Sequence, residues 1–374
     1  MKILFYCGGF APLGGIETFC KNLLCYLQSK DYDCRLVCWG QKSPLLDAIK
    51  QAKVKIIHSP WRWGCQWHIP DWLLLPLGLQ QIKQADVIIL NKLFPIGILK
   101  ILKLQASNHT KFIYITAYRP AEIFHDSEII KIIEALSFFD LILVQSSIFI
   151  DDLYKIGYQG KIESLPLIPH KPLLPRPFPP LQELKIGFLG RLVEDKNIPL
   201  LLNTFSKLQK KYFQFYESKI QQQQTLSLHL FGDGHLREQL EQIAEDLGIK
   251  SSVIFYGNIP NDEVETAIAS CHIFAFTSRR EGQCLAALEI LGGGRPIVAT
   301  AVGAFPEILS DSRLGRIVES TNPSDFADAL MKMAKLVELN AVCPETIYSA
   351  YLERYDPEKV AENYENILSN LCKQ

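Results

Sequence analysis

Two spacings of apolar residues alternate along this chain. Short continuous apolar runs predict buried strands, and an apolar residue at every third or fourth position predicts a helix lying on a sheet. The chain opens with such a pair, a strand over residues 2–7 followed by a helix. The stripe of this helix is formed by Ile16, Phe19, Cys20, Leu23, Leu24 and Leu27. A strand over residues 184–190 and a helix from Ile198 repeat the arrangement.

The other predicted strands also alternate with helical stretches. In the first half they cover residues 35–39, 55–58, 87–90, 111–116 and 141–145. In the second half they cover residues 226–231, 253–256, 273–277, 297–300 and 315–318. Alternation of this kind predicts parallel sheets joined by right-handed crossovers. The expected fold class is therefore α/β, with two Rossmann-like domains.

A proline-rich segment separates the two halves. Residues 166–180 contain seven prolines, which excludes a helix or a central strand there. We expect an extended linker over residues 169–183, between an N-terminal domain of residues 1–168 and a C-terminal domain of residues 184–345. The last stretch, residues 346–374, predicts two helices broken at Pro357.

Composition and charge narrow the class of protein. A chain of 374 residues with 48% apolar residues is long enough for two packed cores. A net charge of -1 argues against nucleic-acid binding. The charge is uneven, however, at +4 over residues 1–168 and -5 over the remainder. This difference fits an N-terminal half that faces an anionic partner.

The cysteines and the N-terminus indicate a cytoplasmic protein. Cys34 and Cys38 are four apart, but no second pair or nearby histidine completes a zinc site. We interpret the ten cysteines as buried thiols in a reducing compartment and expect no metal. The N-terminus enters a strand directly, without the pattern of a signal peptide. No apolar run approaches 18 residues, so we predict no membrane-spanning helix.

Arg191 and Lys196 follow the strand that begins the second domain. They flank the turn that leads into the next helix, and ligands of open α/β sheets bind at that edge. A guanidinium fork and an ammonium suit a phosphate. Two solvated surface cations beside Glu194 and Asp195 are the alternative interpretation.

Two glutamates stand eight positions apart in the second domain. Glu281 and Gly282 lie in a turn before a helix, where backbone N–H groups are available to a ligand. Glu289 lies on that helix, in the otherwise apolar run 285–291. A carboxylate in such surroundings needs a polar partner, and we expect a ligand hydroxyl. For Glu281 the alternative is an ordinary acidic residue in the first turn of a helix.

Two glycine-containing loops are further candidates. The loop 8–15 lacks the G-x-G-x-x-G spacing of a dinucleotide fingerprint, so a nicotinamide enzyme is not expected. Its glycines either make a tight turn or leave room for a sugar. The sequence Gly232-Asp233-Gly234 follows a strand at the same sheet edge as Arg191. An ordinary turn is the alternative there.

These segments together resemble retaining glycosyltransferases of family 4, which have the GT-B fold of two Rossmann-like domains facing each other across a cleft. The resemblance rests on these pieces: Gly190-Arg191-Leu-Val-Glu-Asp-Lys196, Gly232-Asp233-Gly234, Glu281 and Glu289, residues 294–299, Gly303-Ala-Phe-Pro-Glu307, Gly14-Gly15-Ile-Glu-Thr and residues 141–146. Their order and spacing along most of the chain are specific to the family.

The resemblance implies a role for each site residue. Arg191 and Lys196 would hold the diphosphate of a nucleotide sugar, Glu289 the ribose, and Glu281 the transferred sugar. The remaining donor-binding residues would be Gly15, Gly190, Gly232, Asp233, Ile259, Gly282, Gln283, Cys284 and Leu285. By the same resemblance, the last helix, about residues 358–374, would cross back onto the first domain.

The sequence departs from the family pattern in three places. A histidine common in the family is absent, and Ala117 or Tyr118 stands there. Gln283-Cys284 replaces a Phe-Gly pair, and residues 166–169 replace an Asn-Gly turn. With these departures, the sequence does not define the donor sugar.

The resulting hypothesis is a hexosyltransferase. The donor would be a UDP-, GDP- or ADP-sugar, with no tightly bound cofactor, and the phosphate charge would be stabilised without a metal by a front-face route. A non-catalytic binding subunit and a sugar phosphorylase or epimerase of similar fold are the alternatives.

The acceptor is expected on the first domain. Tyr118 and Arg119 follow one of its strands, and Trp61 and Trp63 belong to a tryptophan-rich segment. That segment would either bind a sugar or a lipid interface, or pack over the sheet. We expect a glycan, lipid-linked or small-molecule acceptor and peripheral contact with the inner face of the cytoplasmic membrane.

Overall fold

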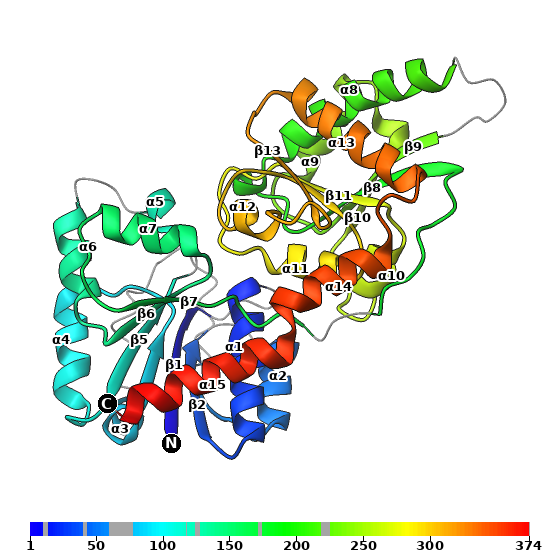
Figure 1. The fold of residues 1–374 in the computed structure, drawn as a ribbon. Coiled ribbons are helices and arrows are strands. Elements are labelled where there is room, and N and C mark those ends of the chain that lie inside the picture. The colour runs from blue at the N-terminus through cyan, green and yellow to red at the C-terminus, as the bar shows by residue number, and fades with distance from the viewer. Residues whose placement is uncertain are drawn as a thin grey trace. The chain divides into compact units, whose positions relative to one another are not determined.

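A computed structural model of the chain describes residues 1–9, 14–39, 43–59, 78–116, 118–123, 128–170, 174–217 and 225–373. The chain forms two compact units. Unit 1 comprises Met1–His170 and Pro357–Gln374, and unit 2 comprises Lys171–Asp356. Each unit is built on its own parallel sheet with helices on both faces (Figure 1).

The described part of unit 1 contains a seven-stranded sheet with the order β3-β2-β1-β4-β5-β6-β7. The strands are β1 (Lys2–Gly9), β2 (Asp33–Trp39), β3 (Lys55–Ser59), β4 (Val87–Leu90), β5 (Lys111–Ile115), β6 (Leu141–Val144) and β7 (Ile162–Ser164). The helices are α1 (Gly15–Ser29), α2 (Pro44–Gln51), α3 (Leu79–Gln84), α4 (Ile96–Gln105), α5 (Pro120–Ile123), α6 (Ile129–Leu136), α7 (Ser147–Lys155) and α15 (Pro357–Lys373). Central strands such as β4 are buried along their whole length, which explains their continuous apolar runs.

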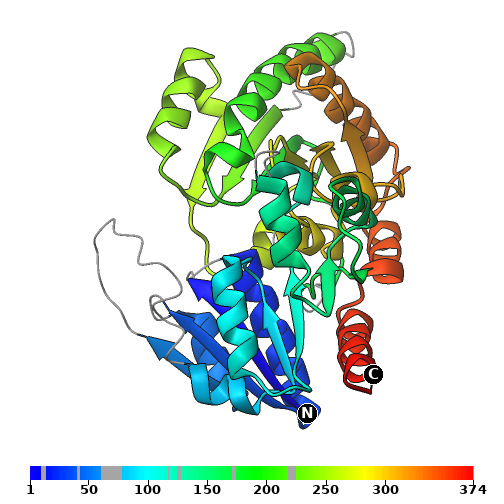
Figure 2. The same cartoon turned by 90° about the vertical axis from the view of Figure 1, so that its left-hand side faces the viewer.

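Helices cover both faces of this sheet. α1, α2 and α15 lie on one face, while α3, α4 and α6 lie on the other (Figures 1 and 2). The apolar stripe predicted for α1 is buried from Phe19 to Leu27. α15 packs on α1, where the rings of Phe19 and Tyr364 lie 5.3 Å apart. Glu365 of α15 also accepts hydrogen bonds from the hydroxyls of Tyr26 and Tyr32.

Unit 2 contains, within its described residues, a six-stranded sheet with the order β10-β9-β8-β11-β12-β13. The strands are β8 (Glu183–Leu189), β9 (Thr225–Phe231), β10 (Val253–Gly257), β11 (Ile273–Phe276), β12 (Ile297–Thr300) and β13 (Gly315–Val318). The helices are α8 (Ile198–Glu217), α9 (Arg237–Asp246), α10 (Val264–Ala269), α11 (Leu285–Gly292), α12 (Phe305–Ile308), α13 (Pro323–Glu338) and α14 (Pro344–Tyr355), with short 3₁₀ turns at Glu194–Lys196 and Lys250–Ser252. α8, α9 and α13 lie on one face and α10, α11 and α14 on the other (Figure 1).

The proline-rich linker is anchored on unit 2 at its second end. The buried Arg295 guanidinium donates hydrogen bonds to the carbonyls of Arg176 and Pro177 at 2.8 and 3.0 Å. It also donates to the carbonyls of Cys271, Ala269, Gly293 and Gly294. This one side chain therefore replaces the backbone partners that an extended proline segment lacks.

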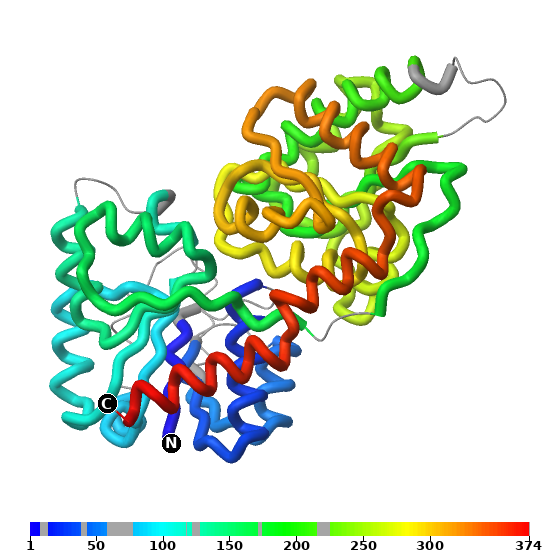
Figure 3. Tube along the Cα trace, in the orientation of Figure 1, coloured from blue at the N-terminus to red at the C-terminus, as the bar shows by residue number. Residues whose placement is uncertain are grey.

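The structure differs from the sequence-based expectation at one strand. β7 was not predicted, because three residues at a sheet edge carry no clear apolar pattern. The two C-terminal helices belong to different units. Ile347, Ala350 and Tyr351 bury α14 in unit 2, so only α15 belongs to unit 1. Figure 3 shows the trace that runs from α14 into α15.

Candidate functional site

The candidate site lies where the strand order of unit 2 reverses. From β8 the chain proceeds to β9 and β10 on one side, and then returns to β11 on the other side of β8. Two loops therefore leave the carboxyl ends of the neighbouring strands β8 and β11. Such a switch point is where open α/β sheets bind ligands. Arg191, Lys196 and Glu281, the three residues predicted to be catalytic, fall on these two loops.

An ion pair joins the two loops. The Lys196 Nζ and the Glu281 Oε1 are 2.5 Å apart, and their side chains are only 18% and 6% exposed. The Ser278 hydroxyl donates a second hydrogen bond, of 2.8 Å, to the same carboxylate oxygen. The structure thus brings together two of the three residues predicted to be catalytic. Ser278 was not among the residues predicted from sequence.

The electrostatics of Lys196 reflect both its burial and this partner. Burial lowers the pKa of Lys196, while the Glu281 carboxylate raises it and the positive charge of Arg191 lowers it again. The carboxylate outweighs the opposing effects, so the pKa lies above the ordinary value of 10.5. Lys196 is therefore a largely buried cation at neutral pH, on the loop where the strand order reverses.

Arg191 stands apart from this ion pair. Its side chain is exposed, and it forms no ion pair with any residue that the structure describes. Its charge nevertheless acts on Lys196, so the two cations share one electrostatic environment. An exposed guanidinium next to a buried ammonium is an arrangement suited to a phosphate-rich anion.

Backbone contacts fix the two loops against each other. The Thr277 hydroxyl donates to the carbonyls of Lys196 and Asn197, at 3.3 and 3.1 Å. The Arg279 amide donates to the Asp195 carbonyl at 2.7 Å, and the Arg280 guanidinium pairs with the Asp195 carboxylate. Sequence reasoning missed these supporting residues, because their partners are about 80 positions away.

The loop after β9 lies directly beside the loop after β8. A Cβ on Gly232 would stand 1.9 Å from the Gly190 carbonyl oxygen, so only glycine allows this approach. The Leu192 amide donates to the Asp233 carbonyl at 2.9 Å. The Asp233 side chain accepts from the Gly234 amide at 2.8 Å. The close approach explains the Gly-Asp-Gly sequence without a ligand.

The turn before α11 leads to the second predicted glutamate. Gly282 and Gln283 are buried, and Cys284 precedes α11 in a left-handed conformation with φ 59°. Burial raises the pKa of the Cys284 thiol, which is therefore neutral at physiological pH. Glu289 lies half-buried on α11, four positions after its first residue, Leu285. Its charge adds to burial in raising the pKa of the Tyr351 phenol on α14.

The other predicted residues lie outside this cluster. Ile259 is half-buried beyond the end of β10, and Gly15 is the first residue of α1 in unit 1. The exposed Tyr118 follows β5. Arg119 pairs with the buried carboxylate of Asp152 on α7, at 2.7 Å. Trp61, Trp63 and Ala117 lie outside the described residues.

Unit 2 matches a known protein family over nearly its whole length. Residues 175–349 match the model of glycosyl transferases group 1. Unit 2 is therefore similar to this family along the matched residues. The matched region contains all the predicted site residues of unit 2, from Gly190 to Glu289.

Curated relatives of this chain are enzymes named as transferases. A D-inositol 3-phosphate glycosyltransferase from Corynebacterium jeikeium is 33% identical over 159 residues, covering 41% of this chain and 36% of the relative. A poly(ribitol-phosphate) alpha-N-acetylglucosaminyltransferase from Staphylococcus aureus is 23% identical over 186 residues, covering 50% of this chain and 35% of the relative. The match thus spans about a third of the length of these relatives.

Solved structures share the fold over nearly the whole chain. The lipopolysaccharide outer core galactosyltransferase WaaB is 18% identical, with a TM-score of 0.74 and coverage of 99% of this chain and 100% of that chain. Anabaena HepE, solved with UDP and glucose, is 16% identical, with a TM-score of 0.75 and coverage of 99% and 100%. These similarities confirm the predicted GT-B fold class.

None of the helices in the described part of the chain combines the length and apolar character that crossing a bilayer requires.

Proposed function

We propose that this protein is a retaining glycosyltransferase that moves a hexose from a nucleotide-diphosphate sugar to an acceptor hydroxyl. The main observation behind this proposal is the Lys196–Glu281 ion pair at the switch point of unit 2, beside the exposed Arg191. It supplies fixed positive charge for a diphosphate and a carboxylate oxygen for sugar hydroxyls within one cluster. The family that unit 2 resembles supports the same chemistry.

The donor binds across the loops of unit 2 in this proposal. Arg191 and Lys196 hold the diphosphate, Glu281 accepts hydrogen bonds from the sugar, and Glu289 binds the ribose. Gln283 and the backbone amides of Cys284 and Leu285 complete the contacts. UDP is the first nucleotide to test, because UDP is named in solved complexes of HepE and of Staphylococcus aureus TarM, which share this fold.

The proposed reaction balances without a covalent intermediate on the protein. The bond between the anomeric carbon and the phosphate oxygen breaks, and a bond from the acceptor oxygen forms on the same face. The acceptor proton moves to the leaving phosphate. Arg191 and Lys196 stabilise the charge that develops on that phosphate, which is the main electrostatic task of such a site.

Nucleotide binding is the first test of this function. A thermal-shift panel with UDP, GDP and ADP, each free and as its glucose conjugate, should raise the melting temperature for one nucleotide. The selected sugar nucleotide should then release free nucleoside diphosphate, and NMR of the product should show a retained anomeric configuration. Binding without release would favour a non-catalytic binding subunit instead.

We further propose that the acceptor is lipid-linked and that unit 1 touches an anionic membrane. The support lies on the neighbouring helices α4 and α6, which expose the aliphatic side chains of Leu104 (83% exposed) and Ile130 (84% exposed). Lys100 and Lys131 are also exposed on these helices. Aliphatic side chains among lysines suit an interface with anionic headgroups.

Vesicle sedimentation tests the membrane proposal. The protein should sediment with vesicles containing anionic phosphatidylglycerol at low salt, and less with purely zwitterionic vesicles. Replacing both Leu104 and Ile130 by Ser should abolish sedimentation without changing nucleotide binding. A wild-type protein that stays in the supernatant with anionic vesicles would refute this part of the proposal.

A further inference from the structure

Helix α14 packs against the helix that carries Glu289. Its Tyr351 is 1% exposed, and a Cβ on Gly292 of α11 would stand 3.3 Å from the Tyr351 ring. A Cβ on Gly294, which has φ 73°, would stand only 2.8 Å from Pro344 at the start of α14. The Tyr351 ring thus packs directly on Gly292, so a shift of one helix requires a shift of the other.

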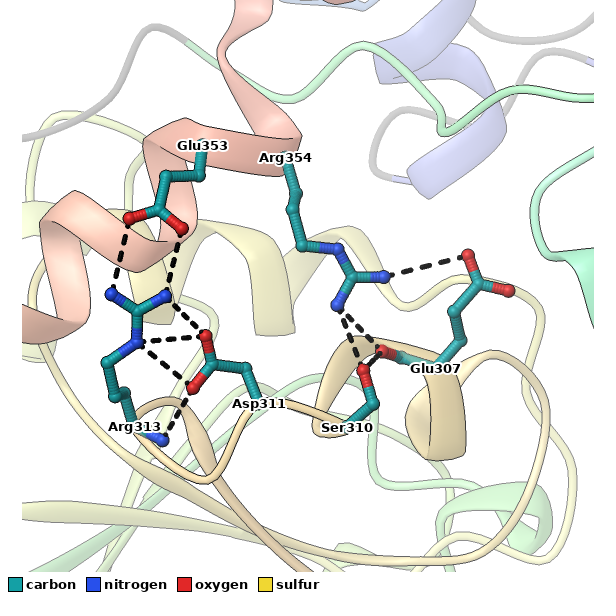
Figure 4. Close-up of polar contacts among 6 residues, drawn as sticks. All are labelled: Glu307, Ser310, Asp311, Arg313, Glu353 and Arg354. Carbon is teal, nitrogen blue, oxygen red and sulfur yellow. Dashed lines mark hydrogen bonds and ion pairs between the residues drawn. The ribbon is translucent and has the colours of Figure 1, made fainter.

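The other end of α14 is bound to the short helix α12 (Figure 4). The Arg354 Nη1 donates to the Glu307 carbonyl at 3.0 Å and to the Ser310 hydroxyl oxygen at 3.1 Å. The Arg354 Nη2 also lies 3.8 Å from the Glu307 carboxylate. Arg354 thus binds the carbonyl end of α12, where the Glu307 carbonyl also accepts hydrogen bonds from the Ser310 amide and hydroxyl.

The opposite end of α12 supports the turn that contains Glu281. The Ala304 amide donates to the Gly282 carbonyl at 2.9 Å. A Cβ on Gly303, which has φ 55°, would stand 2.5 Å from the carbonyl oxygens of both Glu281 and Gly282. The residues at the start of α12 therefore pack so closely against the turn that no side chain fits at position 303.

We propose that Arg354 is a positioning residue of the donor site, which holds α12 so that Gly303 and Ala304 fix the Glu281 turn. The inference rests on the proposed function for what Glu281 binds. It adds that the placement of Glu281 depends on α14, whose residues lie about 70 positions later in the chain. Arg354 itself is assigned no contact with the donor.

The same helix provides a matched control. Glu353 of α14 forms two hydrogen bonds with Arg313, at 2.9 and 3.2 Å, and Arg313 also pairs with Asp311 (Figure 4). This cluster binds α14 to the segment before β13 and not to α12. An Arg313→Ala variant therefore removes an arginine of comparable exposure that also contacts α14, and it leaves the Arg354 contacts in place.

Hydrogen–deuterium exchange tests the structural part of the inference without any ligand. In Arg354→Ala, peptides covering residues 279–290 and 302–308 should exchange about tenfold faster than in the wild type. Arg313→Ala should leave these peptides unchanged, and Arg354→Lys should lie in between. Unchanged exchange in Arg354→Ala would overturn the inference. If that variant does not fold, Arg354→Gln and Arg354→Lys give the same comparison.

Kinetics test the functional part. The kcat/KM for the sugar nucleotide should fall about tenfold in Arg354→Ala, since Glu281 is displaced. The Kd for the free nucleoside diphosphate should stay within about twofold, because Arg191, Lys196 and Glu289 remain. An equal loss in kcat/KM for the sugar nucleotide and in affinity for the nucleoside diphosphate would indicate general destabilisation. That outcome would refute a positioning role. A wild type that binds no nucleotide would refute the proposed function, while the exchange experiment would still decide the role of Arg354.

Discussion

At the scale of single residues, the site depends on two cations in different surroundings. Lys196 is largely buried and already paired with Glu281, whereas Arg191 is exposed and unpaired within the described residues. Removing one partner of a buried ion pair lowers the stability of the fold, because the remaining buried charge has no partner. An exposed cation contributes little to stability. Substitutions at the two positions should therefore separate function from folding.

Replacing Arg191 by Ala should lower kcat at least about tenfold, with little change in stability. In the proposed mechanism Arg191 stabilises charge on the leaving phosphate, and its side chain forms no ion pair within the described residues. Steady-state kinetics and thermal denaturation measure the two effects. Lys250→Ala, which removes an exposed cation of the same unit, is the control and should leave both unchanged. Near-normal turnover in Arg191→Ala would remove Arg191 from the mechanism.

Replacing Glu281 by Gln should lower the free energy of unfolding by roughly 2–3 kcal/mol at neutral pH, since Lys196 loses its counter-charge. The pKa of Lys196 is raised in the folded protein, so the contribution of the pair is fully present below pH 10.5. It is lost as the pH rises above that value through the raised pKa. Urea denaturation at several pH values should show a constant gap up to about pH 9 that narrows at higher pH.

The control for this experiment is Glu194→Gln, which removes an exposed carboxylate of the same loop whose ion-pair partner among the described residues is the exposed His235 ring. Its stability should match that of the wild type across the pH range. A gap for Glu281→Gln that persists unchanged above pH 11 would show that Lys196 is not the source of the lost stability.

At the scale of elements, the site is held by loops that approach each other through glycines. Gly232 lies against the Gly190 carbonyl, and Gly303 lies against the carbonyls of Glu281 and Gly282. These contacts leave no volume for a side chain. The turns thus contact each other closely because the neighbouring strands that precede them end at the same sheet edge. The residue preferences of each turn do not explain this contact.

Replacing Gly303 by Ala should destabilise the protein by at least about 2 kcal/mol and weaken sugar-nucleotide turnover. Its φ of 55° disfavours a side chain, and the added Cβ would meet two carbonyl oxygens at 2.5 Å. Gly97→Ala is the matched control, because a Cβ there meets nothing within 4 Å and Ala favours the helix. Chemical denaturation should show the two variants shifting in opposite directions. Equal stability of Gly303→Ala and wild type would contradict the tight contact.

At the scale of the whole molecule, the linker is bound to unit 2 by one buried side chain. Arg295 satisfies six backbone carbonyls, two of which belong to the linker residues Arg176 and Pro177. The His272 ring also lies 3.0 Å from the carbonyl of Pro179 in the linker. The chain therefore passes between its two units along a segment whose second end is fixed.

Replacing Arg295 by Met should cost at least about 3 kcal/mol and release the linker end, because several buried carbonyls lose their donor. Limited proteolysis should then cleave near residues 174–180 much faster than in the wild type. Arg176→Ala is the control, since it removes only an exposed pair with Glu265 and keeps the carbonyl that Arg295 binds. Equal cleavage rates in wild type and Arg295→Met would show that Arg295 does not hold the linker.

The sequence alone determined the α/β class and the order of the strands along the chain, and it predicted the proline-rich segment and the loops of the candidate site. These features are local: apolar periodicity reports which face of an element is buried, and proline excludes regular structure. Strand ends were accordingly predicted to within two residues at β4, β12 and the central strands of both sheets. Lys196, Glu281 and Glu289 were also identified from sequence, since charged residues at strand ends or on apolar helices are locally anomalous.

Only the tertiary structure decided which of these residues meet. Lys196 and Glu281 are 85 positions apart, and the order in which β8 and β11 pair brings them into contact. The same holds for Arg295 and the linker, for α14 beneath α11, and for the Asp152 partner of Arg119. A side chain's partners depend on which strands lie side by side, and no pattern within a single segment contains that information.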